Sequence, residues 1–315
     1  MRAIFMGTPE FSVPVLRAML AEGVEVVAVV TQPDRPRGRG KGVVCSPVKE
    51  EALRHGLTVF QPEKIRQPEV VEALRALAAD VAVVVAFGQI LSKEVLEAPR
   101  LGCINVHASL LPMYRGAAPI QHVILDGQTE TGVTTMFMDE GLDTGDMLLQ
   151  KVVPIAEDET GGSLTEKLSA AGADLLIETL RQLEAGTLVR TPQTGETCYV
   201  GMIRKSMGQM DWNRPAVELE RQIRGLAPWP SAFTHRDGKL LKIWAARVCE
   251  GGTGHPGEVV ETARDSFLVQ TGQGCLRVTE VQPEGKKRME AAAYLRGYPF
   301  VPGTMLGEAP RSGGR

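Results

Sequence analysis

The sequence lacks a hydrophobic run long enough to form a membrane helix. Its longest apolar runs, VEVVAVV and VAVVVAF, fall well short of the roughly 20 residues that such a helix needs. The first apolar stretch ends at Gly7-Thr8-Pro9, which is too early for a signal peptide. These absences predict a soluble, cytoplasmic protein that does not contact a membrane.

Cysteine is scarce and scattered. The chain has five cysteines, an odd number, and no two of them form a Cys-x-x-Cys pair. A disulfide framework and a structural zinc site are therefore not expected, and a reducing compartment fits this usage. The sequence shows no other cluster of metal-ligating residues, so no metal is expected.

A large excess of charge of one sign is also absent, since the net charge is −3. This average hides an asymmetry along the chain. Residues 1–203 have 18 Lys and Arg against 26 Asp and Glu, whereas residues 204–315 have 17 against 12. A basic C-terminal third on an acidic body is a reason to consider nucleic acid as a partner.

Length and patterning predict two domains. The chain has 315 residues, of which 43% are hydrophobic, enough to form real cores. Up to about residue 186, segments typical of strands alternate with segments typical of helices, which predicts a doubly wound α/β domain. Residues 81–87 are apolar throughout and predict a central parallel strand. A helix is expected to begin at Pro47, with Ser46 as its cap.

The chain changes character after Gly186. Residues 187–209 show no periodicity and are interpreted as a linker, and residues 215–226 have the apolar stripe of a helix. Short segments typical of strands follow, separated by Gly-rich turns, and Asp237-Gly238 is a strong signal for a two-residue hairpin. A small β-barrel or sandwich is expected here.

One glycine pattern resembles a dinucleotide-binding fingerprint. Residues 252–257 match Gly-x-Gly-x-x-Gly, but a proline precedes the third glycine and a strand-like segment follows it. This pattern therefore predicts a turn. The first strand ends in a single glycine, Gly7, so a nicotinamide cofactor is not supported there either.

The stretch CINVHASLLPMYRG, residues 103–116, contains the main chemical signal. Its first five residues are typical of a strand, in which alternate side chains share a face, so Asn105 and His107 lie side by side. The carboxyl end of a strand is where open α/β sheets place ligands and chemistry. Neighbouring loops could also satisfy two such polar groups. Asp143, in the loop DEGLDTGDML, could orient the imidazole of His107 and stabilise its charged form.

Together these motifs resemble the folate-dependent formyltransferases, whose hallmark is Asn-x-His, a Ser-Leu-Leu-Pro segment and a distant Asp. The resemblance covers residues 1 to about 307 and rests on the long ungapped motifs NVHASLLPMYRGAAPIQ and MDEGLDTGDML. Within the family, TQPDRPRGRGK, SPVK, GCINVH and APWP are similar to the branch that acts on an aminoacyl-tRNA.

The resemblance implies both a fold and a reaction. The fold would be a Rossmann-like, doubly wound, mostly parallel sheet at residues 1–189, a linker at 190–206, an OB-like β-barrel at 207–307 that docks tRNA, and a flexible tail at 308–315. The donor would be 10-formyltetrahydrofolate, and the acceptor would be the amine of initiator methionyl-tRNA. The product, N-formylmethionyl-tRNA, would serve translation initiation, and the enzyme is expected to be a monomer.

The three candidate catalytic residues suit this chemistry. Moving a formyl group between nitrogens is acyl transfer, which needs donors for a developing oxyanion, a proton acceptor for the amine and an acid for the leaving nitrogen. Asn105 offers a neutral donor, His107 a charged donor and acid, and Asp143 a carboxylate that takes the amine proton. No metal or covalent enzyme intermediate is required.

The resemblance also implies binding residues. Those expected to bind folate lie in three loops: Phe87, Gly88, Gln89, Ile90, Ser109, Leu110, Leu111, Pro112 and Asp139. Those expected to bind tRNA are basic: Arg35, Arg37, Arg39, Lys41 and Lys205. Four of these alternate with Gly and Pro in a loop that cannot be core, although a merely solvated loop would have the same composition. At Lys205 the chain reads MIRKSMGQM where the family often has Lys-x-x-Lys-Glu-Glu.

Two other functions fit part of the sequence. A formyltransferase for a small amine, such as glycinamide ribonucleotide or an amino sugar, would share Asn105, His107 and Asp143. The Arg-rich loop and the basic C-terminal part favour RNA over that reading. A tRNA-binding module with a decayed catalytic half is the other alternative, and the intact triad argues against it.

Overall fold

The computed structural model describes residues 1–36, 43–301 and 303–307. The chain divides into two compact units. The first comprises residues 1–119, 130–154 and 165–200, and the second comprises residues 120–129, 155–164 and the chain from Gly201 onward. The boundary between Val200 and Gly201 falls inside the predicted linker.

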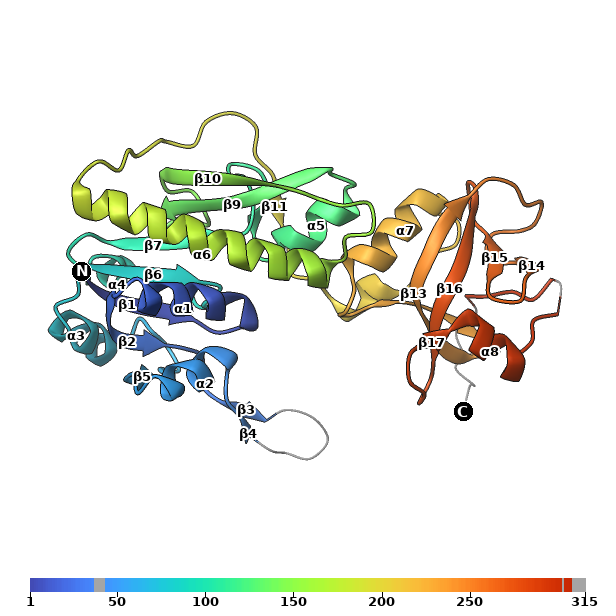
Figure 1. Ribbon diagram of the computed structural model, residues 1–315, viewed down its shortest axis with the longest axis horizontal. Coiled ribbons are helices and arrows are strands. Elements are labelled where there is room, and N and C mark those ends of the chain that lie inside the picture. The colour runs from blue at the N-terminus through green and yellow to red at the C-terminus, as the bar shows by residue number, and fades with distance from the viewer. Residues whose placement is uncertain (37–42, 302, 308–315) are drawn as a thin grey trace. The chain divides into compact units, whose positions relative to one another are not determined.

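The first unit is built on a seven-stranded sheet with the strand order β10-β9-β7-β6-β1-β2-β5 (Figure 1). The five strands from β7 to β5 run parallel, and β9 and β10 are antiparallel to their neighbours. The strands are β1 (Arg2–Gly7), β2 (Glu25–Val30), β5 (Val59–Phe60), β6 (Val81–Val85), β7 (Cys103–His107), β9 (Glu130–Phe137) and β10 (Met147–Pro154). The predicted mostly parallel α/β sheet is confirmed.

Helices connect these strands, as the alternating pattern predicts. They are α1 (Val13–Ala21) with the short η1 (Glu10–Ser12) before it, α2 (Pro47–Arg54), α3 (Pro68–Ala76), α4 (Lys93–Leu96), α5 (Pro119–Leu125) and α6 (Gly161–Ala185). Helix α2 begins at Pro47, and the Ser46 hydroxyl accepts a hydrogen bond from the backbone N–H of Lys49 at 3.1 Å. The predicted cap is therefore confirmed, and it satisfies one of the free N–H groups of the first turn.

The sheet's core explains the apolar runs in the sequence. Every residue of β6 is buried, since the strand lies between β1 and β7 and helices cover both faces. On β7, Val106 lies under α6, where Gly172 allows close approach: an added Cβ would lie 2.9 Å from Val106. Cys103 lies on the opposite face, against the carbonyls of α4. Asn105 and His107 share this second face because strand side chains alternate.

The second unit contains an antiparallel sheet with the order β12-β13-β16-β15-β14, and β17 pairs with β16. Its elements are η2 (Lys205–Gly208), α7 (Ala216–Gly225), β12 (Ala232–Arg236), β13 (Lys239–Cys249), β14 (Val259–Thr262), β15 (Phe267–Gln270), β16 (Cys275–Pro283), β17 (Met289–Glu290) and α8 (Ala291–Gly297). The buried core includes Trp212, Leu219 and Phe267. The predicted α7 and antiparallel β domain are confirmed.

Residues 303–307 connect the two edge strands of this sheet. The backbone N–H of Val259 in β14 donates to Thr304, and the N–H of Gly307 donates to the carbonyl of His235 in β12 at 2.9 Å. The sheet is thereby closed into a ring, as the expected barrel requires. The glycine pattern at 252–257 forms a turn before β14, as predicted.

Two further pairs of short strands lie outside the main sheets. They are β3 (Arg35–Pro36) with β4 (Val43–Val44), and β8 (Arg115–Gly116) with β11 (Tyr199–Val200). The second pair attaches part of the predicted linker to the first unit. The predicted tail at 308–315 lies outside the described residues.

Within the described ranges, no helix combines the length and apolar character that a membrane span requires. All five cysteines are free thiols: Cys45, Cys103, Cys198, Cys249 and Cys275.

Candidate active site

Asn105 and His107 lie at the carboxyl end of β7, in the middle of the first unit's sheet. The backbone of Asn105 pairs with Val84 of β6 on one side and Met136 of β9 on the other. Both polar side chains are buried, with 9% and 6% of their surface exposed. The sequence prediction that the two side chains share one face at a strand end is therefore consistent with the structure.

Both ring nitrogens of His107 face an acceptor. Nε2 lies 3.0 Å from the carbonyl oxygen of Tyr114, and because a carbonyl only accepts, Nε2 carries a proton and donates it. Nδ1 lies 3.7 Å from Oδ2 of Asp143. This distance is within reach of an ion pair but too long for a hydrogen bond. Both side chains are shielded from water, so the carboxylate's charge acts on the ring with little screening.

The loop between β9 and β10 holds Asp143 in place. Oδ2 of Asp143 accepts a hydrogen bond from the backbone N–H of Gly116 at 2.8 Å. Asp143 itself has φ of +55°, a conformation that few residues other than glycine adopt. Asp139 shapes the same loop, since its Oδ1 accepts from the N–H of Gly141 and from the hydroxyl of Thr144. The loop therefore fixes the backbone from which the carboxylate projects.

The side-chain amide of Asn105 has no hydrogen-bond partner among the described residues. The residue is largely buried, yet its amide atoms are not among the fully buried polar atoms that lack a partner, so the amide reaches the open edge of the site. An unpaired amide beside a buried imidazole and carboxylate is typical of a group that awaits a ligand. The donors of Asn105 are available to an oxygen placed at this edge of the sheet.

Cys103 lies on the same face of β7 but is not a candidate nucleophile. Burial raises the pKa of its thiol to about 12, so the reactive thiolate is not populated near neutral pH. Among the described residues, no three His, Cys, Asp or Glu side chains gather in a way that would hold a metal ion.

The predicted folate segment at residues 109–112 is firmly held. The buried hydroxyl of Ser109 donates to the carbonyl of Met113 at 2.7 Å, and the hydroxyl of Thr134 bridges the Ser109 carbonyl and the Leu111 N–H. Ser109 and Leu111 are almost fully buried, whereas Leu110 and Pro112 are half-buried. Ser109 and Leu111 therefore stabilise the turn, whereas the side chains of Leu110 and Pro112 are partly accessible to a ligand.

The predicted folate loop at 87–90 follows β6. Phe87 is buried, and its carbonyl accepts from the hydroxyl of Thr8 and from the amide of Gln32. The side chain of Gln89 accepts from the N–H of Ile65 and donates to a further carbonyl, so it anchors the loop. Ile90 is 86% exposed, which is unusual for an isoleucine and leaves it free to contact a ligand.

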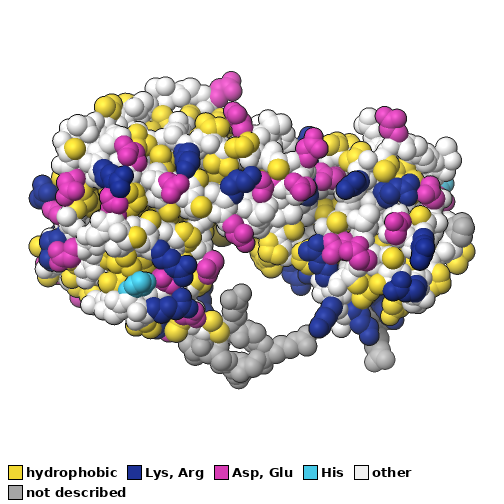
Figure 2. All heavy atoms as spheres, in the orientation of Figure 1, with side chains coloured by type: hydrophobic (Ala, Val, Ile, Leu, Met, Phe, Trp, Pro, Cys, Tyr) yellow, Lys and Arg dark blue, Asp and Glu magenta, His cyan; other side chains and the backbone are white. Residues whose placement is uncertain are grey.

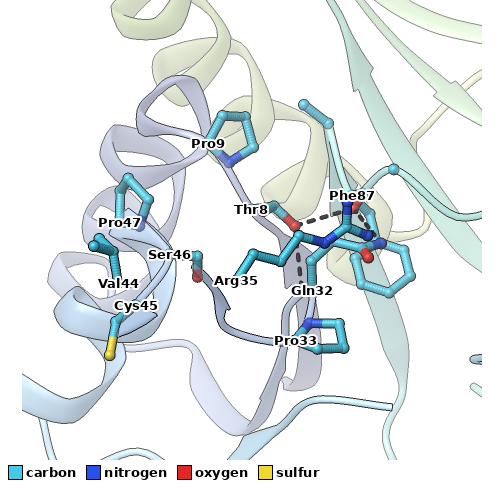
Figure 3. Close-up of a pocket in the computed structure, with 12 residues that line it drawn as sticks. Thr8, Pro9, Gln32, Pro33, Arg35, Val44, Cys45, Ser46, Pro47 and Phe87 are labelled. Carbon is cyan, nitrogen blue, oxygen red and sulfur yellow. Dashed lines mark hydrogen bonds between the residues drawn. The ribbon is translucent and has the colours of Figure 1, made fainter. Parts of the chain in front are cut away.

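A pocket of about 480 Å³ opens where β1, β2 and β6 end (Figure 3). Its lining includes the predicted residues Arg35, Phe87 and Gly88, but not Asn105, His107 or Asp143. Figure 3 shows the Arg35 side chain extending toward the Phe87 side of the pocket. The sequence analysis missed three polar lining residues: Thr8, Gln32 and Ser46. Thr8 comes directly after β1 and Gln32 lies two residues beyond the end of β2, and these positions were a usable signal.

The base of the Arg-rich loop is anchored by an ion pair. Oδ2 of Asp34 accepts from the ammonium of Lys49 in α2, and Oδ1 accepts from the amide of Gln61. The hydrogen bond from Lys49, with help from Gln61, lowers the pKa of Asp34 below its ordinary value. The pair therefore holds both ions charged where the loop leaves β2.

The predicted tRNA-binding residues are only partly described. Arg35 is exposed on β3, and Lys205 is exposed on η2 in the second unit. Arg37, Arg39 and Lys41 lie outside the described residues. Figure 2 shows Lys and Arg side chains on the second unit interspersed with Asp and Glu.

Comparisons with known families and proteins agree with this site. The profile of a family described as formyl transferase matches residues 1–180, and that of the formyl transferase C-terminal domain matches residues 202–299. A methionyl-tRNA formyltransferase of Agathobacter rectalis is 56% identical over 94% of this chain and 96% of its own length. One of Geobacter sulfurreducens is 52% identical over 98% of both chains.

Solved structures show the same fold at low sequence identity. WlaRD, a sugar 3N-formyl transferase determined with dTDP and 5-N-formyl-THF, aligns with a TM-score of 0.67 at 18% identity, over 91% of this chain and 99% of its own. HypX of Aquifex aeolicus in complex with tetrahydrofolic acid aligns with a TM-score of 0.65 at 18% identity, over 98% of this chain. The chain spans only 51% of the length of HypX.

Proposed function

Because this chain belongs to the formyl transferase family, we propose that it moves the formyl group of 10-formyltetrahydrofolate to the amine of methionine on initiator tRNA. It is an enzyme of formyl transfer from a folate donor. The chain is 52–56% identical, over nearly its full length, to proteins named methionyl-tRNA formyltransferase, which supports methionyl-tRNA as the acceptor. The observation that carries the proposal is the buried group Asn105, His107 and Asp143, in which the Asn105 amide is unpaired among the described residues.

The first step is direct attack of the methionyl amine on the formyl carbon. A carbon–nitrogen bond forms, and the carbonyl oxygen becomes an oxyanion. The Asn105 amide donates to this oxygen, and the Nε2–H of His107 turns to it from the Tyr114 carbonyl. Two donors aimed at one oxygen stabilise the tetrahedral intermediate because its charge develops there.

The second step breaks the bond between the formyl carbon and the folate nitrogen. Asp143 accepts the proton that the attacking amine loses, directly or through a water molecule, and His107 gives a proton to the leaving nitrogen. The proton on Asp143 then returns to the neighbouring imidazole of His107, so both side chains regain their starting states and charge balances over the cycle. The amine attacks the donor itself, so no covalent enzyme intermediate forms.

Folate binding is assigned to three loops beside the catalytic group. Ile90, Leu110 and Pro112 offer apolar surface, and the backbone N–H of Phe87 and the backbone of Gly88 offer polar groups. Gln89, Ser109, Leu111 and Asp139 act through the loop conformations that they fix. The donor binds between these loops, with its formyl group at Asn105.

Binding of tRNA is assigned to the Arg-rich loop and the basic second unit. Arg35, Arg37, Arg39 and Lys41 neutralise phosphates near the acceptor end, and Lys205 contributes from η2. Such contacts make binding salt-dependent. A small amine needs neither feature, which favours tRNA over an amino sugar or a nucleotide amine.

Transfer of a labelled formyl group tests the acceptor. Purified enzyme and labelled 10-formyltetrahydrofolate are mixed with charged initiator tRNA, with glycinamide ribonucleotide or with an amino sugar nucleotide. We expect label on methionyl-tRNA and none on the small amines. Equal or faster labelling of a small amine would contradict the proposal.

A further inference from the structure

Gln193 is the one half-buried residue in a stretch of exposed chain. It belongs to the segment interpreted from sequence as a linker, and residues 190–192 and 194–197 around it are exposed. Its side chain reaches into the first unit rather than into solvent. The conformation of the flanking segment is fixed by β11, which pairs with β8.

The amide of Gln193 joins two parts of the active site. Nε2 donates to the backbone carbonyls of Asp143 and Gly145, at 2.9 and 2.8 Å. Oε1 accepts from Nε and Nη2 of Arg115, at 3.1 and 2.7 Å. Both donors and both acceptor lone pairs of the amide are thus directed at the Asp143 loop and at β8.

The Asp143 loop and β8 also contact each other directly, at the carboxylate of Asp143. Gly116, the residue after Arg115, donates its N–H to Oδ2 of Asp143. The loop is therefore held at its backbone by Gln193 and at its side chain by Gly116. Arg115 is fixed in turn, since its guanidinium donates to the hydroxyl of Tyr199 and its N–H to the carbonyl of Cys198.

We propose that Gln193 is a positioning residue that sets the Asp143 carboxylate against His107. The inference rests on the proposed catalytic role of Asp143. At 3.7 Å the carboxylate lies just outside hydrogen-bond distance of the imidazole, so a small displacement of the loop decides whether the two groups can meet. The unusual backbone conformation of Asp143 needs external support, and the two hydrogen bonds from Gln193 supply it beside that residue.

Steady-state kinetics of two Gln193 variants test the proposal. Gln193→Ala removes all four hydrogen bonds, whereas Gln193→Glu keeps the acceptor for Arg115 and loses both donors to the Asp143 loop. Misplacing a catalytic group by about 1 Å can lower turnover by about 100-fold, so we expect kcat to fall roughly 10- to 100-fold in both variants. The KM values for folate and tRNA should change little.

Gln182→Ala is the matched control, since Gln182 lies in α6, away from the Asp143 loop, and its amide donates to Glu178 of the same helix. It should keep wild-type kinetics. Gln193 could instead only hold its own segment, residues 190–197, against the first unit. In that case Gln193→Glu would keep a normal kcat, or the KM for tRNA would rise while kcat stayed constant. Either result would overturn the proposal.

A double-mutant cycle with Asp143→Asn separates this proposal from the proposed function. Single-turnover rates at high enzyme concentration are measured for both single variants and the double variant. If Gln193 acts through Asp143, Gln193→Ala costs much less in the Asp143→Asn background than in the wild type. Equal costs in both backgrounds refute the positioning role. A normal rate for Asp143→Asn alone refutes the proposed function instead.

Discussion

His107 is held between two acceptors, and this fact constrains its chemistry. Its Nε2–H is committed to the Tyr114 carbonyl and its Nδ1 faces Asp143, so no ring nitrogen is free in the observed arrangement. Asn105 is the opposite case, a buried amide without a partner in the part of the chain that the structure describes. The amide is therefore the group that a formyl oxygen meets without displacing an existing contact.

Replacing Asn105 by alanine tests this role. Losing one oxyanion donor typically lowers kcat by about 100- to 1000-fold, and we expect a loss of that size with little change in folate affinity. The melting temperature should hold, because the wild-type amide makes no hydrogen bond to a described residue. Asn213, the chain's only other asparagine, is exposed and bonds to Asp211, so Asn213→Ala is the control. A kcat within a few fold of wild type for Asn105→Ala would remove Asn105 from the mechanism.

Sequence patterns predicted the pair on β7 but not its surroundings. The alternation of side chains along a strand was enough to bring Asn105 and His107 to one face. The contact of His107 with the Tyr114 carbonyl depends on Tyr114 at φ of +57°, which no local pattern signals for a tyrosine. The role of Gln193 was missed for a similar reason, since its three partner residues, Arg115, Asp143 and Gly145, are distant in sequence.

Among the elements, those with strong local signals were predicted and those made by tertiary pairing were not. The capped start of α2, the buried β6 and the Asp237-Gly238 turn between β12 and β13 follow from residues next to one another. Asp237 and Gly238 both have positive φ, as the predicted hairpin turn requires. Strands β8 and β11 are two residues each and exist only because they pair across more than 80 residues of sequence.

Helix α2 is tied to α1 by a buried carboxylate. Glu51 of α2 is 3% exposed and accepts two hydrogen bonds from Arg17 of α1, both at 2.7 Å. The hydrogen bonds from Arg17, with those from His55, lower the pKa of Glu51 from 4.5 to about 2. Because the folded-state pKa is depressed, the stabilisation is complete above pH 4.5 and is lost as the pH falls toward 2.

We therefore expect Glu51→Gln to lower the free energy of unfolding at pH 7 by about 1 to 2 kcal/mol, since the partners are half exposed and water screens them. The difference from wild type should shrink as the pH falls, and vanish near the depressed pKa. Denaturant unfolding from pH 7 to pH 3 measures this. Glu50→Gln, an exposed neighbour on the same helix, is the control and should track wild type throughout. A constant difference at every pH would refute the assignment.

For the whole molecule, the charge asymmetry of the sequence predicts that the C-terminal unit contacts RNA. The N-terminal part is acidic except in its Arg-rich loop, and the C-terminal part is basic. Composition alone identified this difference in charge between the two parts, and the family resemblance connected the basic part with tRNA binding. How the basic side chains of the second unit contact RNA could not be derived, because Lys and Arg are interspersed there with Asp and Glu.

Neutralising Arg37 and Arg39 together should weaken tRNA use while leaving folate binding unchanged. Each phosphate contact contributes close to one unit to the slope of log affinity against log salt concentration. Arg37→Ala with Arg39→Ala should therefore reduce that slope by about 2. Binding of initiator tRNA at several salt concentrations measures it. A slope equal to that of wild type would mean that these side chains do not contact phosphates.

The central claim is that Asn105, His107 and Asp143 surround one formyl oxygen and its neighbouring nitrogens. A crystal structure of the protein with a formyl-folate and a methionyl-tRNA analogue measures this directly. The account predicts that the formyl oxygen lies within about 3 Å of Nδ2 of Asn105 and Nε2 of His107. It also predicts that the Asp143 carboxylate closes from 3.7 Å to hydrogen-bond distance of the imidazole. A formyl group bound away from Asn105, or a carboxylate turned away from His107 with both ligands in place, would contradict it.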